Sequence, residues 1–126
     1  MTFVTIDGDD IGRRLAACYL SNDVTALETT RELVDLKTQQ ISDLLTELGY
    51  NVLFCAADGV TAHSKAEIID DMRLYQRIEN TVGLELAFSV GVGKTLREAY
   101  VALLFAKSTG KARLCNFKSM ESECLE

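Results

Sequence analysis

The chain has 126 residues, of which 48% are apolar and 25% charged, and its formal net charge is −6. The length suits one domain, and the composition is that of an ordinary soluble globular protein. Proteins that bind long nucleic acids normally carry the opposite charge, because phosphate neutralisation supplies most of their affinity, so a long polynucleotide partner is not expected.

The N-terminal half of the chain predicts one strand and two helices. Residues 2–7 are mostly β-branched and apolar, which is typical of a strand that enters a sheet core. Asp9 and Asp10 precede a helical pattern over residues 11–20, and we expect them to cap that helix. A long helix with an apolar stripe is predicted over residues 24–48.

The C-terminal half alternates strands and helices. Residues 50–55 and 60–62 predict two strands of a hairpin. A helix, a strand, a second helix and a last strand follow, over residues 65–80, 84–92, 96–108 and 113–117. The order β-α-α-β-β-α-β-α-β matches the split βαβ plan of ferredoxin-like folds. We therefore expect an α+β fold with a mainly antiparallel sheet and helices on one face.

The domain is expected to cover residues 1–118, and residues 119–126 are expected to form an acidic, frayed tail. The four cysteines contain no CxxC pair, and their spacing fits neither a zinc site nor a disulfide framework. Acidic residues interrupt the apolar start, so no signal peptide is predicted. No apolar stretch approaches the roughly 20 residues that span a bilayer. We expect a cytoplasmic protein without membrane insertion.

Two aspartates form a candidate metal site. Asp7 ends the first strand, and Asp58 lies at the turn of the central hairpin. In a split βαβ sheet these strands are neighbours, so both carboxylates can reach one point. Mg²⁺ takes one or two carboxylates together with substrate phosphates. The competing interpretation is that Asp7 only ends its strand and Asp58 only serves its turn.

The segment after the first strand and two lysines are candidate phosphate ligands. Backbone N–H groups at the helix start, around Asp10, Ile11 and Gly12, can hold phosphates. Lys107 ends the last predicted helix and Lys111 lies in the loop after it, and opposite a metal site with two carboxylates both become candidate phosphate ligands. Each lysine alone is also an ordinary partner of a helix C-terminus.

With these motifs the chain resembles the palm-domain nucleotide cyclase and polymerase superfamily, and most closely the minimal CRISPR polymerases. The similarity rests on IDGDDIG near the N-terminus, on the hairpin that carries Asp58, and on the segment AKSTGKAR. It implies that Asp7, Asp58 and the carbonyl of Gly8 bind Mg²⁺ or Mn²⁺. It also implies that Ile11, Gly12, Lys107 and Lys111 contact a triphosphate. The hairpin departs from the GGDEF pattern, since it reads Ala-Ala-Asp-Gly and lacks the second acid.

The resemblance implies a nucleotidyltransferase that converts ATP, or another nucleoside triphosphate, into a small cyclic di- or oligonucleotide. Pyrophosphate would be released, and a separate nucleotide-sensing effector would read the product in antiviral defence. Because cyclisation joins two nucleotides, a homodimer is expected. Two alternatives remain open: a palm-type triphosphate hydrolase or cyclohydrolase, and a degenerate palm that binds a nucleotide and acts by protein interaction.

Overall fold

The computed structural model describes the backbone of residues 1–124 and the side chains of residues 1–120. Five strands and five helices follow one another in this part of the chain. They are β1 (Thr2–Gly8), α1 (Ile11–Leu20), α2 (Val24–Leu48), β2 (Asn51–Ala56), β3 (Gly59–Ser64), α3 (Asp71–Val82), β4 (Phe88–Gly93), α4 (Leu96–Ser108), β5 (Leu114–Asn116) and α5 (Phe117–Cys124). The predicted order of the first nine elements is confirmed.

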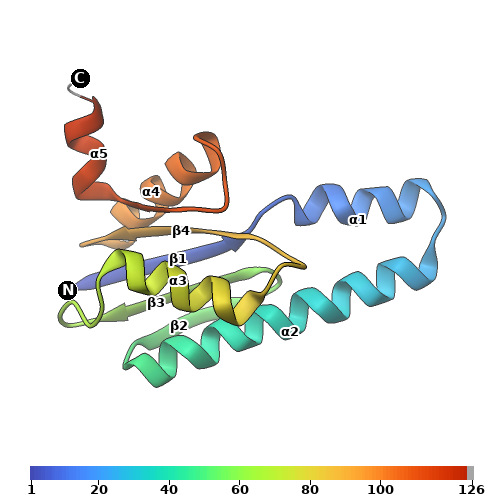
Figure 1. Ribbon diagram of the computed structural model, residues 1–126, viewed down its shortest axis with the longest axis horizontal. Coiled ribbons are helices and arrows are strands. Elements are labelled where there is room, and N and C mark those ends of the chain that lie inside the picture. Colours follow the sequence, from blue (N-terminus) through green and yellow to red (C-terminus); the bar gives the residue numbers. More distant parts are fainter. Residues whose placement is uncertain (125–126) are drawn as a thin grey trace.

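The five strands form one sheet in the order β2-β3-β1-β4-β5 (Figure 1). The pairs β2–β3, β1–β3 and β1–β4 are antiparallel, and β5 lies parallel to β4. The first four strands reproduce the split βαβ arrangement, which confirms the α+β ferredoxin-like fold. Strand β1 is central, so the residues at its end have a neighbour on either side.

The main core lies between one face of the sheet and the helices α2 and α3. Val4 and Ile6 alternate with more exposed residues along β1 and are 0% and 1% exposed. They belong to one apolar cluster with Ile41 of α2 and Ile78 of α3. This two-residue period follows from the pleat of a strand with one face on the core.

Helix α4 covers the opposite face, which corrects the prediction that all helices lie on one face. Figure 1 shows α4 on the other side of the sheet from α2 and α3. The backbone of α4 approaches β4 so closely that a Cβ at Gly91 would lie 2.1 Å from the carbonyl oxygen of Ala99. The connection between β4 and the parallel strand β5 needs a crossover helix, and α4 is that helix.

The starts of two elements differ from the predictions, and one further helix is present. Helix α3 begins at Asp71 and not near residue 65, because the Asp70 side chain caps it by accepting a 2.9 Å hydrogen bond from the N–H of Arg73. Strand β4 begins at Phe88 and not at residue 84, since the exposed residue Leu84 lies in the preceding loop. Helix α5 was not expected, and it includes most of the segment predicted as a tail.

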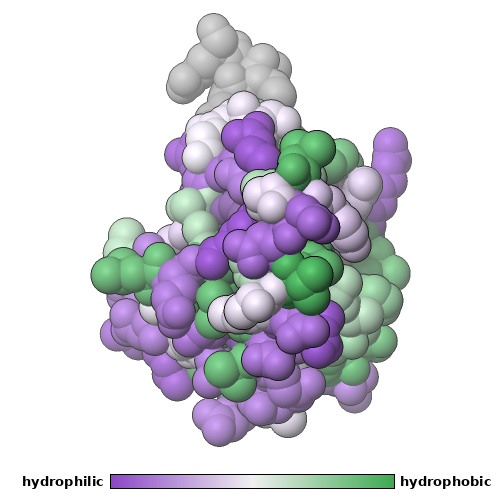
Figure 2. All heavy atoms as spheres, turned by 90° about the vertical axis from the view of Figure 1, so that its right-hand side faces the viewer, coloured by the Kyte–Doolittle hydropathy of each residue, from purple (hydrophilic) through white to green (hydrophobic). Residues whose placement is uncertain are grey.

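Helices α1 and α2 extend beyond the sheet at one end of the molecule (Figure 1). Figure 2 views the molecule from this end and shows hydrophilic side chains interspersed with separate hydrophobic ones. Among the described residues, no helix combines the length and the apolar character needed to cross a membrane.

Candidate functional site

The end of β1 and the turn of the β2–β3 hairpin bring Asp7, Gly8 and Asp58 together. Asp7 pairs with Gly59 across the two strands, and the N–H of Gly8 donates a 3.0 Å hydrogen bond to the carbonyl oxygen of Asp58. A Cβ at Gly8 would lie 3.1 Å from Oδ2 of Asp58. The two carboxylates predicted to share a site therefore do lie beside each other.

The hairpin that carries Asp58 turns through Ala57 and Asp58, while Gly59 already belongs to β3. Ala57 has a φ of 51°, a left-handed conformation that glycine adopts more readily. Asp58 is partly buried, and burial, followed by the charge of Asp7, raises the pKa of its carboxyl group. Two carboxylates thus lie at one point with their mutual repulsion only partly compensated.

Lys107 of α4 supplies the compensating charge. Its Nζ lies 3.0 Å from Oδ2 of Asp7 and donates hydrogen bonds to the carbonyl oxygen of Gly8 at 2.8 Å and to Oδ1 of Asp9 at 3.1 Å. Burial by itself would lower the pKa of Lys107, but the hydrogen bonds to Asp7 and Asp9 outweigh burial and raise it. Helix α4, on the face opposite the main core, is therefore the element that brings a cation to the carboxylates.

Asp9 has a role that sequence reasoning missed. Its side chain is only 4% exposed and accepts hydrogen bonds from the Ser89 hydroxyl at 2.7 Å, from Lys107 and from the N–H of Ala112 at 2.8 Å. The prediction that Asp9 caps α1 is wrong, because these partners in β4, α4 and the following loop use its carboxylate. The sequence feature that could have indicated this role is the position of Asp9, an acidic residue two positions after Asp7.

Asp10 occupies the N-cap position of α1 but its side chain makes no capping hydrogen bond, so that prediction is also wrong. Its Oδ1 lies 2.6 Å from Nζ of Lys111, and the hydrogen bond from Lys111 lowers the pKa of Asp10. Lys111 lies in a turn in which Gly110, Lys111 and Ala112 all have positive φ values. This turn folds back onto the β1–α1 loop and brings Lys111 to it.

The start of α1 leaves room for a ligand. Ile11 is buried, whereas a Cβ at Gly12 would meet nothing within 4 Å. The first N–H groups of any helix have no partner within the helix. A hollow of about 400 Å³ adjoins this turn, between Arg13 and Arg14 on α1 and Leu86 before β4. The predicted nucleotide-binding segment therefore borders open space, and the lining of this hollow includes Asp9 and Asp10.

A second hollow, of about 320 Å³, lies on the other side of Asp7, over the sheet face beside α4. Its lining includes Asp7, Lys107 and three apolar side chains, those of Phe54, Tyr100 and Leu104. Phe54 and Tyr100 are 56% and 57% exposed. Large exposed aromatic side chains beside a polar site are typical of surfaces that bind a partner or a ligand.

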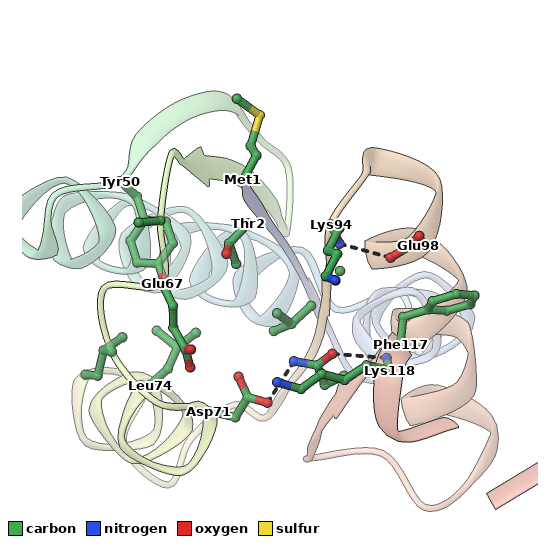
Figure 3. A pocket seen from close by; sticks show the side chains of 15 residues that line it. Met1, Thr2, Tyr50, Glu67, Asp71, Leu74, Lys94, Glu98, Phe117 and Lys118 are labelled. Carbon is green, nitrogen blue, oxygen red and sulfur yellow. Dashed lines mark hydrogen bonds between the residues drawn. The ribbon is translucent and has the colours of Figure 1, made fainter. Parts of the chain in front are cut away.

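A third hollow, of about 420 Å³, lies at the opposite end of the sheet (Figure 3). Its wall includes Met1 and Thr2 at the start of β1, whereas Asp7 stands at the end of that strand. Five residues of strand separate Thr2 from Asp7, roughly 16 Å. Figure 3 shows Lys94 and Asp71 at this hollow, each hydrogen-bonded within the protein. It shares no lining residue with the carboxylate site.

The donor set fits a hard divalent cation. Carboxylate oxygens of Asp7 and Asp58 and the carbonyl oxygen of Gly8 are the ligand types that Mg²⁺ and Mn²⁺ prefer. The Asp7 and Gly8 oxygens already hold a cation, the ammonium group of Lys107. Among the described residues, no group of three or more His, Cys, Asp or Glu side chains could hold a metal ion. A metal at this site would therefore need further oxygen ligands, such as phosphates.

Comparison with known proteins agrees with the fold. The chain matches the minimal CRISPR polymerase domain over residues 3–117. No curated protein shows significant sequence similarity to it. The structure is similar to an EAL/GGDEF domain protein from M. capsulatus, with a TM-score of 0.64, 18% identity, and 92% of this chain and 83% of that chain covered.

It is also similar to the GGDEF domain of TpbB (YfiN) from Pseudomonas aeruginosa, with a TM-score of 0.67 and 14% identity. This comparison covers 98% of this chain and 80% of that chain. At such low identities the two structures show the fold alone, whereas the family match extends over almost the whole chain. The protein therefore has the fold of GGDEF domains, and it belongs to the family of minimal CRISPR polymerase domains.

Proposed function

We propose that the protein is a nucleotidyltransferase that converts ATP, or another nucleoside triphosphate, into a small cyclic di- or oligonucleotide. The observation that carries the proposal is the convergence of Asp7, the Gly8 carbonyl and Asp58 on one point next to Lys107. Oxygen ligands facing a cation beside an open helix start suit a metal-bound triphosphate. A GGDEF-like fold and membership of a polymerase family support the same activity.

In this reaction a ribose hydroxyl oxygen bonds to the α-phosphorus of a triphosphate, the bond to the β-phosphate bridge breaks, and pyrophosphate leaves. Asp7, Asp58 and the Gly8 carbonyl would hold Mg²⁺ or Mn²⁺, and the ion would lower the pKa of the hydroxyl group and neutralise charge on the phosphates. Lys107 and Lys111 bind the triphosphate oxygens, and the N–H groups of Ile11 and Gly12 orient them. The hydroxyl proton passes to solvent.

We propose that the enzyme works as a homodimer with the two sites facing each other. A cyclic dinucleotide contains two phosphodiester bonds, so two triphosphates have to meet. The exposed side chains of Phe54, Tyr100 and Leu104 adjoin Asp7, and a second copy that approaches this face would cover them. The apolar surface and the reaction chemistry thus favour the same contact.

We place the protein in the cytoplasm, where nucleoside triphosphates are available. We further propose that a separate effector binds its product in antiviral defence. The family supports this assignment. Two other functions fit the same site: hydrolysis or cyclohydrolysis of a triphosphate, and nucleotide binding without turnover.

One experiment separates these functions. The purified protein is incubated with each nucleoside triphosphate and Mg²⁺, and the products are resolved by mass. We expect a cyclic nucleotide and pyrophosphate, with no product from the Asp58→Asn variant. Release of a nucleoside diphosphate and phosphate, or of a ring-opened base, would make the protein a hydrolase or cyclohydrolase. Binding without any product would leave the interaction role.

A further inference from the structure

The ammonium group of Lys107 uses all of its hydrogen-bonding capacity at the candidate metal site. An ammonium group has three N–H donors. Lys107 has three acceptors within 3.1 Å, namely Oδ2 of Asp7, the carbonyl oxygen of Gly8 and Oδ1 of Asp9. Two of these acceptors belong to residues proposed above as metal ligands. The third belongs to a residue that the proposed reaction does not yet use.

A lysine ammonium and a divalent cation repel each other strongly at contact distance. The same oxygen atoms of Asp7 and Gly8 therefore do not bind the ammonium group and the metal ion at the same time. Asp9, by contrast, is held in place independently of Lys107, by the Ser89 hydroxyl and by the N–H of Ala112. Its buried carboxylate therefore stays where it is when the long, flexible lysine side chain changes its partners.

We propose that Lys107 competes with the divalent cation for Asp7 and Gly8, and that Asp9 is the positioning residue that keeps the displaced ammonium at the site. This inference rests on the proposed function. After displacement, Lys107 keeps Asp9 as a partner and has two N–H donors for the triphosphate. The triphosphate oxygens thus give Lys107 new acceptors in place of the Asp7 and Gly8 oxygens that bind the metal.

The arrangement couples the two ligands. A metal ion alone has to displace Lys107 without giving it new partners, so it binds weakly. When a metal ion binds together with a triphosphate, the triphosphate oxygens serve both as further ligands of the metal and as new acceptors for Lys107. Each ligand therefore increases the affinity for the other by the same factor.

The test measures Mn²⁺ binding by the paramagnetic resonance signal of the free ion, with no nucleotide present and hence no turnover. Lys107→Met keeps an unbranched, apolar side chain as far as the Cε position and removes the ammonium group with its charge. We expect this variant to bind Mn²⁺ at least about tenfold more tightly than the wild type, because the competing charge is gone. In the presence of ATP the advantage disappears, because the contact to the phosphates is lost as well.

Lys111→Met is the matched control. It removes the same charge from the same segment, but Lys111 contacts Asp10 and neither Asp7 nor Gly8. Without nucleotide, we expect this variant to change the Mn²⁺ affinity by less than about threefold, because the charge of Lys111 acts on the site only through a longer-range field that salt screens. Equal Mn²⁺ affinities for Lys107→Met and Lys111→Met would overturn the competition.

Asp9→Asn tests the positioning role. We define the coupling as the ratio of Mn²⁺ affinities with and without ATP, and expect Asp9→Asn to reduce it about tenfold, the value of a charge-assisted contact. Ser89→Ala removes a neutral donor from the same Oδ1 and should lower thermal stability without changing the coupling. If Asp9→Asn changes stability alone, as Ser89→Ala does, Asp9 is only structural and the inference fails.

Failure of the inference differs from failure of the proposed function. If neither the wild type nor Lys107→Met binds Mn²⁺ in a manner that Asp58→Asn abolishes, the metal site itself is wrong, and the proposed function fails with it. If both bind Mn²⁺ at that site with equal affinity, the metal site stands and only the competition is refuted.

Discussion

At the scale of single residues, the site places two carboxylates together at an energetic cost that the proposed function explains. Burial and the neighbouring Asp7 both disfavour the ionised form of Asp58, which raises its pKa. A group whose pKa is raised in the folded state destabilises that state once it is ionised at neutral pH. The charge of Asp58 therefore does not stabilise the fold, whereas the proposed function accounts for it through ligand binding.

Replacing this charge should separate activity from stability. We expect Asp58→Asn, and likewise Asp7→Asn, to abolish product formation because each removes one metal-ligating charge while keeping the shape of the side chain. In EDTA, the Tm of Asp58→Asn should equal or exceed that of the wild type at pH 7, measured by circular dichroism. Wild-type product formation by Asp58→Asn would contradict the two-carboxylate site.

Lys107 should matter for the phosphates of the substrate and not for its nucleoside. We expect Lys107→Ala to weaken the binding of Mg²⁺-ATP by about 1.5–3 kcal/mol, the value of a hydrogen bond to a charged group. Adenosine should bind the variant and the wild type alike. Calorimetric titration with both ligands checks this, and an equal loss for both would exclude Lys107 from the phosphate site.

At the scale of elements, the contact between α4 and β4 determines where Lys107 lies. The α4 backbone comes so close to the strand that glycine is required at position 91, where a Cβ would lie 2.1 Å from the Ala99 oxygen and 2.4 Å from the Leu103 nitrogen. Those atoms are backbone and have little room to shift. A side chain here would push α4, and with it Lys107, away from the sheet.

We therefore expect Gly91→Ala to lower the free energy of unfolding by about 1–3 kcal/mol, the usual range for overpacking. Gly12→Ala is the matched control, because a Cβ there meets nothing within 4 Å and α1 gains helix propensity. It should raise the free energy of unfolding by about 0.5 kcal/mol. Urea titrations measure both, and similar values for the two variants would show that α4 tolerates displacement.

At the scale of the whole molecule, one chain carries one Asp7–Asp58 pair, so product formation should depend on a dimer. We expect the rate per chain to fall on dilution below the dimer dissociation constant. An excess of Asp58→Asn chains should suppress the cyclic product beyond simple dilution of active sites, and linear dinucleotide should accumulate. A monomer by light scattering with a concentration-independent specific rate would refute the facing-site dimer.

The sequence by itself determined the element order and the meeting of Asp7 with Asp58. Strand and helix patterns, helix ends and the hairpin turn all depend on neighbours within a few residues, and the split βαβ order then makes β1 and β3 neighbours. Membership of the family was likewise visible in the segments IDGDDIG and AKSTGKAR.

Only the tertiary structure decided what surrounds the aspartates. Asp9 meets Ser89 and Ala112 across 80 and 103 residues of chain, and the local capping rule named helix α1 as its partner instead. The face that α4 covers was decided in the same way, by the parallel crossover from β4 to β5. Local patterns specify which elements form, whereas the partners of a buried charge depend on how those elements pack, because a buried charge takes whichever donors the packing brings to it.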